Sequence, residues 1–273
     1  VTVGHDYRIA STGDVDITGE TRAGHLFHIA GGTVNLGGGL SSPAIEVEAD
    51  RLELSGDGLS VDGNLGLNLA GALNVTGPLS VSGNASIGTG GDQRFASDVA
   101  AGGYLALDAG GGLNVAGSIR SGGDALLAAR QGLNVGAGID ASGHLFIRTD
   151  SDATVSGAVR AGAGFVAEAG GSLDLGGTLT AGSGMRLVAG QDVLVAGDVT
   201  AGALTVRADD AEFAGAIAVG GDSDYSVGAL RVAGTMQSGG NLDIEAGGGG
   251  VSAHRILGDR DVLIRSQSGI RLD

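Results

Sequence analysis

The sequence has no cysteine and no tryptophan, only two prolines, and aromatic residues at 3% of its 273 positions. The absence of cysteine excludes disulfide bonds and cysteine-ligated metal sites. So few large aromatic residues do not suit the wide hydrophobic core of an ordinary globular domain. Collagen is excluded as well, because proline is scarce and glycine does not recur at every third position.

Positive charge is also scarce. The chain carries 15 basic residues, all of them arginine, against 31 acidic residues, and its formal net charge is −16. Such a surface repels phosphate groups, so the composition disfavours binding to nucleic acid or to an anionic membrane. No apolar run approaches the roughly 18 residues of a membrane helix, and residues 1–4 do not form a signal peptide. If the protein is secreted, we expect this chain to be an internal segment of a longer precursor.

Glycine and small apolar residues are abundant: there are 56 glycines, and 42% of the residues are hydrophobic. They recur in the pattern apolar-x-apolar-x-Gly-x-apolar, as in residues 112–119 and 172–179. The second apolar residue of this pattern occurs fourteen times from Ile17 to Leu272, and the thirteen steps across these 255 residues average about 19.6 residues. A fixed period of this size indicates a solenoid.

Each period contains three apolar clusters, because a second apolar-x-apolar pair precedes the first by roughly eight residues and a further apolar residue follows it by four. Alternation of apolar and polar residues marks strands with one face inside and one outside. Strands too short to bury a core alone gain stability by stacking on their neighbours. We therefore predict an all-β parallel β-helix of about 14 coils of 19–20 residues, with a triangular cross-section, forming a single shaft over residues 1–273.

Two sets of residues define the predicted coil. The first set consists of inward-facing anchors of the core: Val75, Val115, Val135, Val155, Leu175 and Val195. The second set consists of glycines at one corner, where the chain needs a close backbone approach or a positive φ: Gly19, Gly38, Gly56, Gly77, Gly117, Gly157, Gly177, Gly197, Gly215 and Gly234. We expect irregular coils near residues 209–227 and 247–256, with a loop at Gly247–Gly250.

The repeat in residues 112–119, Gly-Leu-Asn-Val-Ala-Gly-Ser-Ile, resembles the repeats of filamentous haemagglutinin and related two-partner-secreted exoproteins of Gram-negative bacteria. The resemblance covers essentially the whole chain. It implies a right-handed parallel β-helix on the cell surface, exported through a dedicated outer-membrane transporter. It also implies a role in adhesion to host cells or, as an alternative, as the stalk of a contact-dependent growth inhibition toxin. The family's Asn-Pro secretion signature is missing, so the resemblance extends to the shaft only.

Parallel β-helices also carry polysaccharide lyases and hydrolases, which use clustered carboxylates. Closely spaced acidic pairs occur here, and Asp222 with Asp224 is the candidate pair for a calcium ion. The chain has neither the long loops nor the aromatic sugar platforms that such enzymes use. We therefore predict no catalytic residue and no cofactor, and interpret the acidic pairs as solvated turns.

The histidines are interpreted as surface residues. His25 and His28 are separated by two residues, but residues three apart on a strand face opposite sides, so they do not form a metal-ligand pair. His5 and His254 are expected to stand alone. Exposed strands at the two ends of the chain lead us to expect end-to-end self-association.

Overall fold

The computed structural model describes residues 2–37, 40–56 and 58–272, and every regular element in these ranges is a β-strand. Nowhere in these ranges is there a helix long and apolar enough to cross a membrane. The chain divides into two compact units, Val1–Gly136 and Ala137–Asp273.

The first unit contains β1 (Thr2–Val3), β2 (Tyr7–Ala10), β3 (Val15–Ile17), β4 (Thr21–Ala23), β5 (Leu26–Leu36), β6 (Leu40–Ser41), β7 (Ala44–Leu54), β8 (Leu59–Val61), β9 (Asn64–Leu69), β10 (Leu73–Val75), β11 (Leu79–Val81), β12 (Ala85–Thr89), β13 (Gln93–Phe95), β14 (Val99–Ala101), β15 (Leu105–Ala109), β16 (Leu113–Val115), β17 (Ile119–Ser121), β18 (Ala125–Ala129) and β19 (Leu133–Val135).

The second unit contains β20 (Ile139–Ala141), β21 (Leu145–Thr149), β22 (Ala153–Val155), β23 (Val159–Ala161), β24 (Phe165–Ala169), β25 (Leu173–Leu175), β26 (Leu179–Ala181), β27 (Gly184–Ala189), β28 (Val193–Val195), β29 (Val199–Ala201), β30 (Ala203–Phe213), β31 (Ile217–Val219), β32 (Ser223–Ser238), β33 (Leu242–Gly258), β34 (Val262–Ser266) and β35 (Ile270–Leu272).

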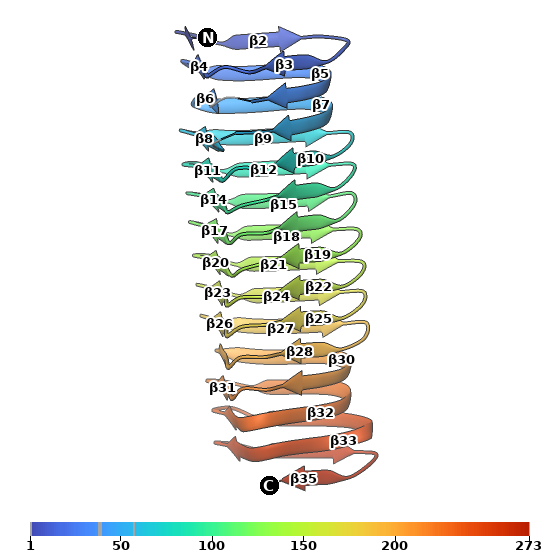
Figure 1. The fold of residues 1–273 in the computed structure, drawn as a ribbon. Helices are drawn as coiled ribbons and strands as arrows, with labels where there is room; N and C mark the ends of the chain where they lie inside the picture. Colours follow the sequence, from blue (N-terminus) through green and yellow to red (C-terminus); the bar gives the residue numbers. More distant parts are fainter. Residues whose placement is uncertain (1, 38–39, 57, 273) are drawn as a thin grey trace. The chain divides into compact units, whose positions relative to one another are not determined.

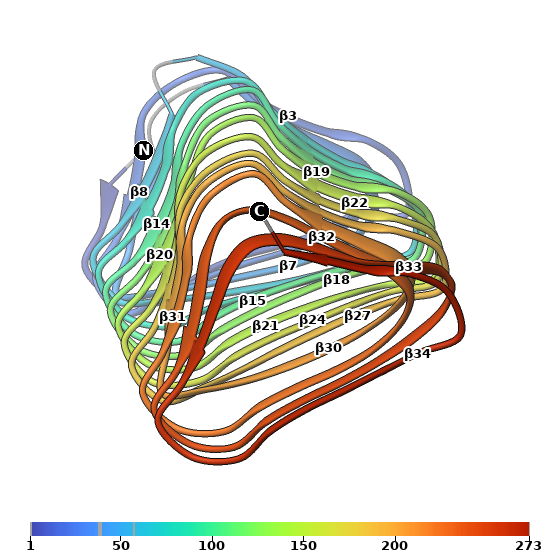
Figure 2. The same ribbon diagram turned by 90° about the horizontal axis from the view of Figure 1, so that it is seen from below.

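Within each unit, a regular coil runs through three strands that lie on three sides (Figures 1 and 2). Each strand pairs in parallel with the strand three places later, as β10 does with β13 and β13 with β16. The register advances by one whole coil, so Leu73 lies beside Gln93, and Gln93 beside Leu113. This arrangement confirms the predicted parallel β-helix with three strands per coil.

The chain makes about 13 turns, one fewer than predicted. Fourteen anchor positions were counted from Ile17 to Leu272, but fourteen positions enclose only thirteen complete turns. The period itself, close to 20 residues, is the spacing seen in the paired registers.

The interior is a thin core of aliphatic side chains. Residues alternate between inward and outward positions along most strands, as in β25, where Leu173 and Leu175 are buried and Asp174 is exposed. Each fully buried Val, Leu or Ile contributes about 1.5–3 kcal/mol. The larger rings of Phe27, Phe95, Phe165 and Phe213 are also fully buried, so the bore accepts a few aromatic residues.

One corner has two forms, and outside β33 the number of residues across it decides which one occurs. In regular coils the two inward positions that flank this corner are eight positions apart, as are Ile87 and Phe95, and a turn lies between the strands. Where the spacing is seven, as between Ile29 and Leu36, the two strands fuse into one, β5, which pairs with both β2 and β3. The shorter corner has no residues to spare for a turn, so the strand bends around it.

The prediction of a loop at Gly247–Gly250 is wrong, because these glycines lie inside β33. The pairing of β32 with β33 skips at this point: Val227 lies beside Ala246, and Ala229 lies beside Gly250. Three residues on β33 therefore oppose one on β32. Glycine allows this bulge without steric cost, and Gly250 has a φ of 79°.

Candidate functional site

All six predicted core anchors are buried, and none exposes more than 2% of its surface. Of the predicted corner glycines, Gly38 lies outside the described residues. The other nine lie in the connections between strands, apart from Gly234, which lies within β32. Their role as corner residues stays a prediction.

Most of these glycines have no room for a side chain. A Cβ on Gly177 would lie 2.5 Å from the backbone nitrogen of Ala158, and one on Gly197 would lie 2.6 Å from the carbonyl carbon of Gly177. Gly56 has in addition a φ of 112°. Gly19 differs, because nothing lies within 4 Å of a Cβ built there. Close stacking of successive corners therefore demands glycine at Gly177 and Gly197 but not at Gly19.

A set of polar side chains, which we call the inter-coil clamps, links several of the coils to the coil that follows. A clamp residue lies at or just before the start of a strand, and its side chain accepts a hydrogen bond from a backbone N–H at the equivalent place one coil later. The clamps of the first unit, with the residue whose N–H each one accepts, are Asp14 with Thr33, Asn64 with Asn84, Asn84 with Tyr104, Asp92 with Gly112 and Asp98 with Ser118.

The second unit repeats the arrangement, with N···O distances of 2.7–2.8 Å for its carboxylate clamps: Asp152 with Ser172, Asp198 with Ala216 and Asp222 with Asn241. His144 takes the same place with a ring nitrogen, since its Nδ1 accepts from the N–H of Gly164 at 3.1 Å. These N–H groups lie at the turns, where carboxylate, amide and imidazole acceptors satisfy them.

Asp98 is the most strongly engaged clamp. Its Oδ1 accepts the N–H of Ser118 at 2.7 Å and the hydroxyl of the same residue at 3.0 Å. These bonds, the backbone one first, lower the pKa of Asp98 below its usual value, and the charge of Arg120 adds to the effect. The carboxylate form is thus part of the folded coil.

The candidate calcium pair, Asp222 and Asp224, lies along an open groove with a volume of about 320 Å³, which Asn241 and Asp243 also line. Asp222 is engaged as a clamp, and Asp243 forms an ion pair with Arg265 at 3.3 Å. Among the residues that the structure describes, no group of three or more histidine, aspartate or glutamate side chains is arranged to hold a metal ion.

The histidines lie on the outside, but His5 does not stand alone as expected. Its ring stacks on that of His25, with centroids 5.5 Å apart and planes 6° from parallel. Equivalent turns of successive coils lie above one another, so residues 20 positions apart meet. His28 faces a different partner, because its Nδ1 lies 3.6 Å from a carboxylate oxygen of Glu46.

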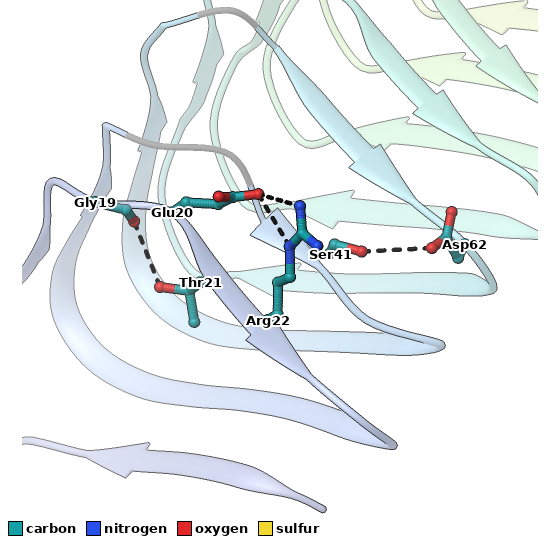
Figure 3. A network of polar contacts seen from close by, with 6 residues as sticks. All are labelled: Gly19, Glu20, Thr21, Arg22, Ser41 and Asp62. Carbon is teal, nitrogen blue, oxygen red and sulfur yellow. Dashed lines mark hydrogen bonds and ion pairs between the residues drawn. The ribbon is translucent and has the colours of Figure 1, made fainter. Parts of the chain in front are cut away.

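Two sets of polar contacts lie on the surface of the first unit, one at β4 and one between β6 and the residue after β8 (Figure 3). The guanidinium of Arg22 donates to the carboxylate of Glu20 at 2.6 and 3.0 Å. On the next coils, the hydroxyl of Ser41 donates to Asp62 at 3.4 Å. The ion pair is well exposed, and exposed pairs of this kind contribute little to stability.

Two buried polar atoms lack a hydrogen-bond partner among the described residues: the hydroxyl of Tyr225 and Oε1 of Gln93. The ring of Tyr225 packs edge-on against Phe213, with centroids 6.4 Å apart. Gln93 is better satisfied, since its Nε2 donates to the carbonyls of Ile87 and Asp108. Both side chains occupy inward positions that aliphatic residues fill in other coils.

Sequence reasoning missed the clamps, although a signal for them exists. Asp92, Asp98, Asp152, Asp198 and Asp222 each stand directly before the first residue of a strand. An acidic residue or asparagine at that place, repeated at the coil period, marks a clamp. The interpretation of the acidic pairs, Asp222 among them, as solvated turns is therefore incomplete, because Asp222 also holds the next coil.

Comparison with known proteins identifies the repeat along the whole chain. The family described as hemagglutinin repeat matches residues 1–138, and the family described as haemagglutinin repeat matches residues 140–200 and 199–272. No curated protein and no solved structure matches the chain.

Proposed function

We propose that this chain, which belongs to the haemagglutinin repeat family, is a length of the β-helical shaft of a secreted, surface-exposed bacterial exoprotein. The task of that exoprotein is attachment to host cells. The family consists of structural, adhesin-like repeats, and the fold is a stack of coils. A shaft holds a binding module away from the cell surface, and this chain supplies length and stiffness.

One observation carries the proposal. Acidic side chains at the turns, such as Asp98, Asp152 and Asp222, are engaged in holding the next coil. The apolar side chains are engaged in filling the interior. Both sets of side chains thus maintain the stack, which is what a structural element requires.

Attachment can be tested with bacteria that produce the complete exoprotein. We expect them to adhere to cultured host cells more than bacteria that lack the protein. A Val155→Asp variant, which places a charge in the core, should reduce surface display and attachment together, whereas Arg160→Asp should change neither. If attachment is unchanged after removal of the protein, and the strain that produces the protein inhibits the growth of neighbouring bacteria, the alternative of a toxin stalk would be supported instead.

Export is proposed to require a dedicated outer-membrane transporter as partner. Deleting that transporter should leave the exoprotein in the periplasm, which fractionation and surface labelling of intact cells would detect. Surface display at the normal level without the transporter would contradict this part of the proposal.

The proposal excludes enzymatic turnover by this segment. A screen of uronate polymers with product detection should find no activity. Asp209 and Asp210 form an adjacent acidic pair on β30. Polymer cleavage that is lost in an Asp209→Ala variant would overturn the structural role and favour a polysaccharide lyase or hydrolase.

A further inference from the structure

The inter-coil clamps perform one task with two kinds of acceptor. Asn84 accepts the N–H of Tyr104 through an amide oxygen at 2.8 Å. Two turns further along the chain, Asp98 accepts the N–H of Ser118 through a carboxylate oxygen at 2.7 Å. Both acceptors stand directly before a strand, and both donors lie 20 residues later. The two clamps differ in chemistry, because an amide does not titrate in water and a carboxyl group does.

We propose that Asp98 is an acid-sensitive link between coils: protonation of its carboxylate releases the turn at Ser118, while the amide clamp from Asn84 to Tyr104 stays closed. A protonated carboxyl is a weaker acceptor than a carboxylate, and a charge-assisted hydrogen bond is lost. The link between β14 and β17 at this corner would then rest on backbone pairing alone.

The surroundings of Asp98 contain few other charges. β11 (Leu-Ser-Val) and β14 (Val-Ala-Ala) carry none, and the turns that precede β11, β14 and β17 contain no charged residue besides Asp98 itself. Arg120, on β17, lowers the pKa of Asp98 together with the bonds from Ser118. Arg94, on β13, and Asp92, directly before β13, are the other charged residues nearby in the sequence. Asp92 is the clamp of another turn, because its carboxylate accepts the N–H of Gly112. Neither arginine loses its charge on acidification, so the response of the Ser118 N–H belongs to Asp98.

The direction of the effect follows from linkage. The pKa of Asp98 is lower in the folded chain than in the unfolded chain. Its contribution to stability is therefore present above the unfolded pKa and is lost as the pH falls through the folded pKa. Asn84 makes no such contribution, because its amide, which accepts the backbone N–H of Tyr104, does not titrate.

Native-state amide hydrogen exchange on the whole chain tests this link, with protection calculated against unstructured peptide at each pH from 7 to 3. We expect protection of the Ser118 N–H to fall on acidification and that of the Tyr104 N–H to stay. In Asp98→Asn the fall at Ser118 should disappear. In Asn84→Asp a new fall should appear at Tyr104.

Two results would overturn the proposal. One is a parallel loss of protection at Ser118 and Tyr104 in the unmodified chain, which indicates general acid unfolding. The other is an Asn84→Asp variant whose Tyr104 amide gains no acid sensitivity. This second variant keeps the test decisive even if Asp98→Asn fails to fold by circular dichroism.

Discussion

Val155 and Arg160 lie five residues apart on successive strands of one coil, yet Val155 is fully buried and Arg160 is exposed. Replacing Val155 by Asp would place a charge in a dry interior without a partner, and we expect the free energy of unfolding to fall by about 4 kcal/mol or more. Arg160→Asp should be nearly neutral. Urea unfolding of the two variants measures the difference, and equal midpoints would show that the assignment of inward positions is wrong.

The hydroxyl of Tyr225 is a second residue-scale test. Burial raises the pKa of Tyr225, and the hydroxyl has no hydrogen-bond partner among the described residues. Tyr225→Phe removes the unpaired group, so we expect stability to rise by about 1 kcal/mol at neutral pH. A loss of stability would mean that the hydroxyl is satisfied in solution.

The same substitution has a pH dependence. Burial raises the pKa of Tyr225, so the folded state holds its phenol neutral. The contribution of this group to the stability of the chain is therefore fully present below the unfolded pKa of about 10, and it is lost as the pH rises from there towards the folded pKa. The advantage of Tyr225→Phe over the parent chain should therefore widen above about pH 10 in thermal melts. A constant difference across this range would argue against burial of the ring.

Positions that face inward could be predicted from the sequence, because alternation along a strand is visible in the residue types themselves. Val115 and Leu175 are examples, since each ends an apolar-x-apolar pair. The clamps could not be predicted in this way. The partner of Asp98 is a backbone N–H at Ser118, and only the register between coils reveals that these two groups meet.

At the scale of elements, the corner between strands limits which residues can stack. We expect Gly177→Ala to destabilise the chain by about 1–3 kcal/mol, because the new Cβ would lie 2.5 Å from the backbone of the preceding coil. Gly19→Ala is the matched control, since nothing lies within 4 Å of its Cβ. Differential scanning calorimetry compares the two, and equal melting temperatures would contradict the role proposed for the corner glycines.

The form of each corner was within reach of the sequence but was not predicted. Val206 and Phe213 are seven positions apart rather than eight, and the two strands that a turn separates in regular coils are fused here into β30. The bulge at Gly247–Gly250 is harder to anticipate, because a glycine run fits a loop and a bulge equally well. Only the pairing of β33 with β32 distinguishes them.

The chain is a stack of coils, and we expect its stability to depend on the register between them. Deleting residues 99–118 removes one coil and joins Asp98 to Ile119, which reproduces the junction of Asp98 with Val99. Deleting residues 99–108 removes half a coil and turns the following strands onto the wrong side. Urea unfolding, monitored by circular dichroism, measures how the two deletion variants differ in stability. For the whole-coil deletion we predict a cooperative unfolding transition close to that of the parent chain, and for the half-coil deletion we predict that this transition is lost. Equal behaviour of the two variants would show that the stability of the stack does not depend on register.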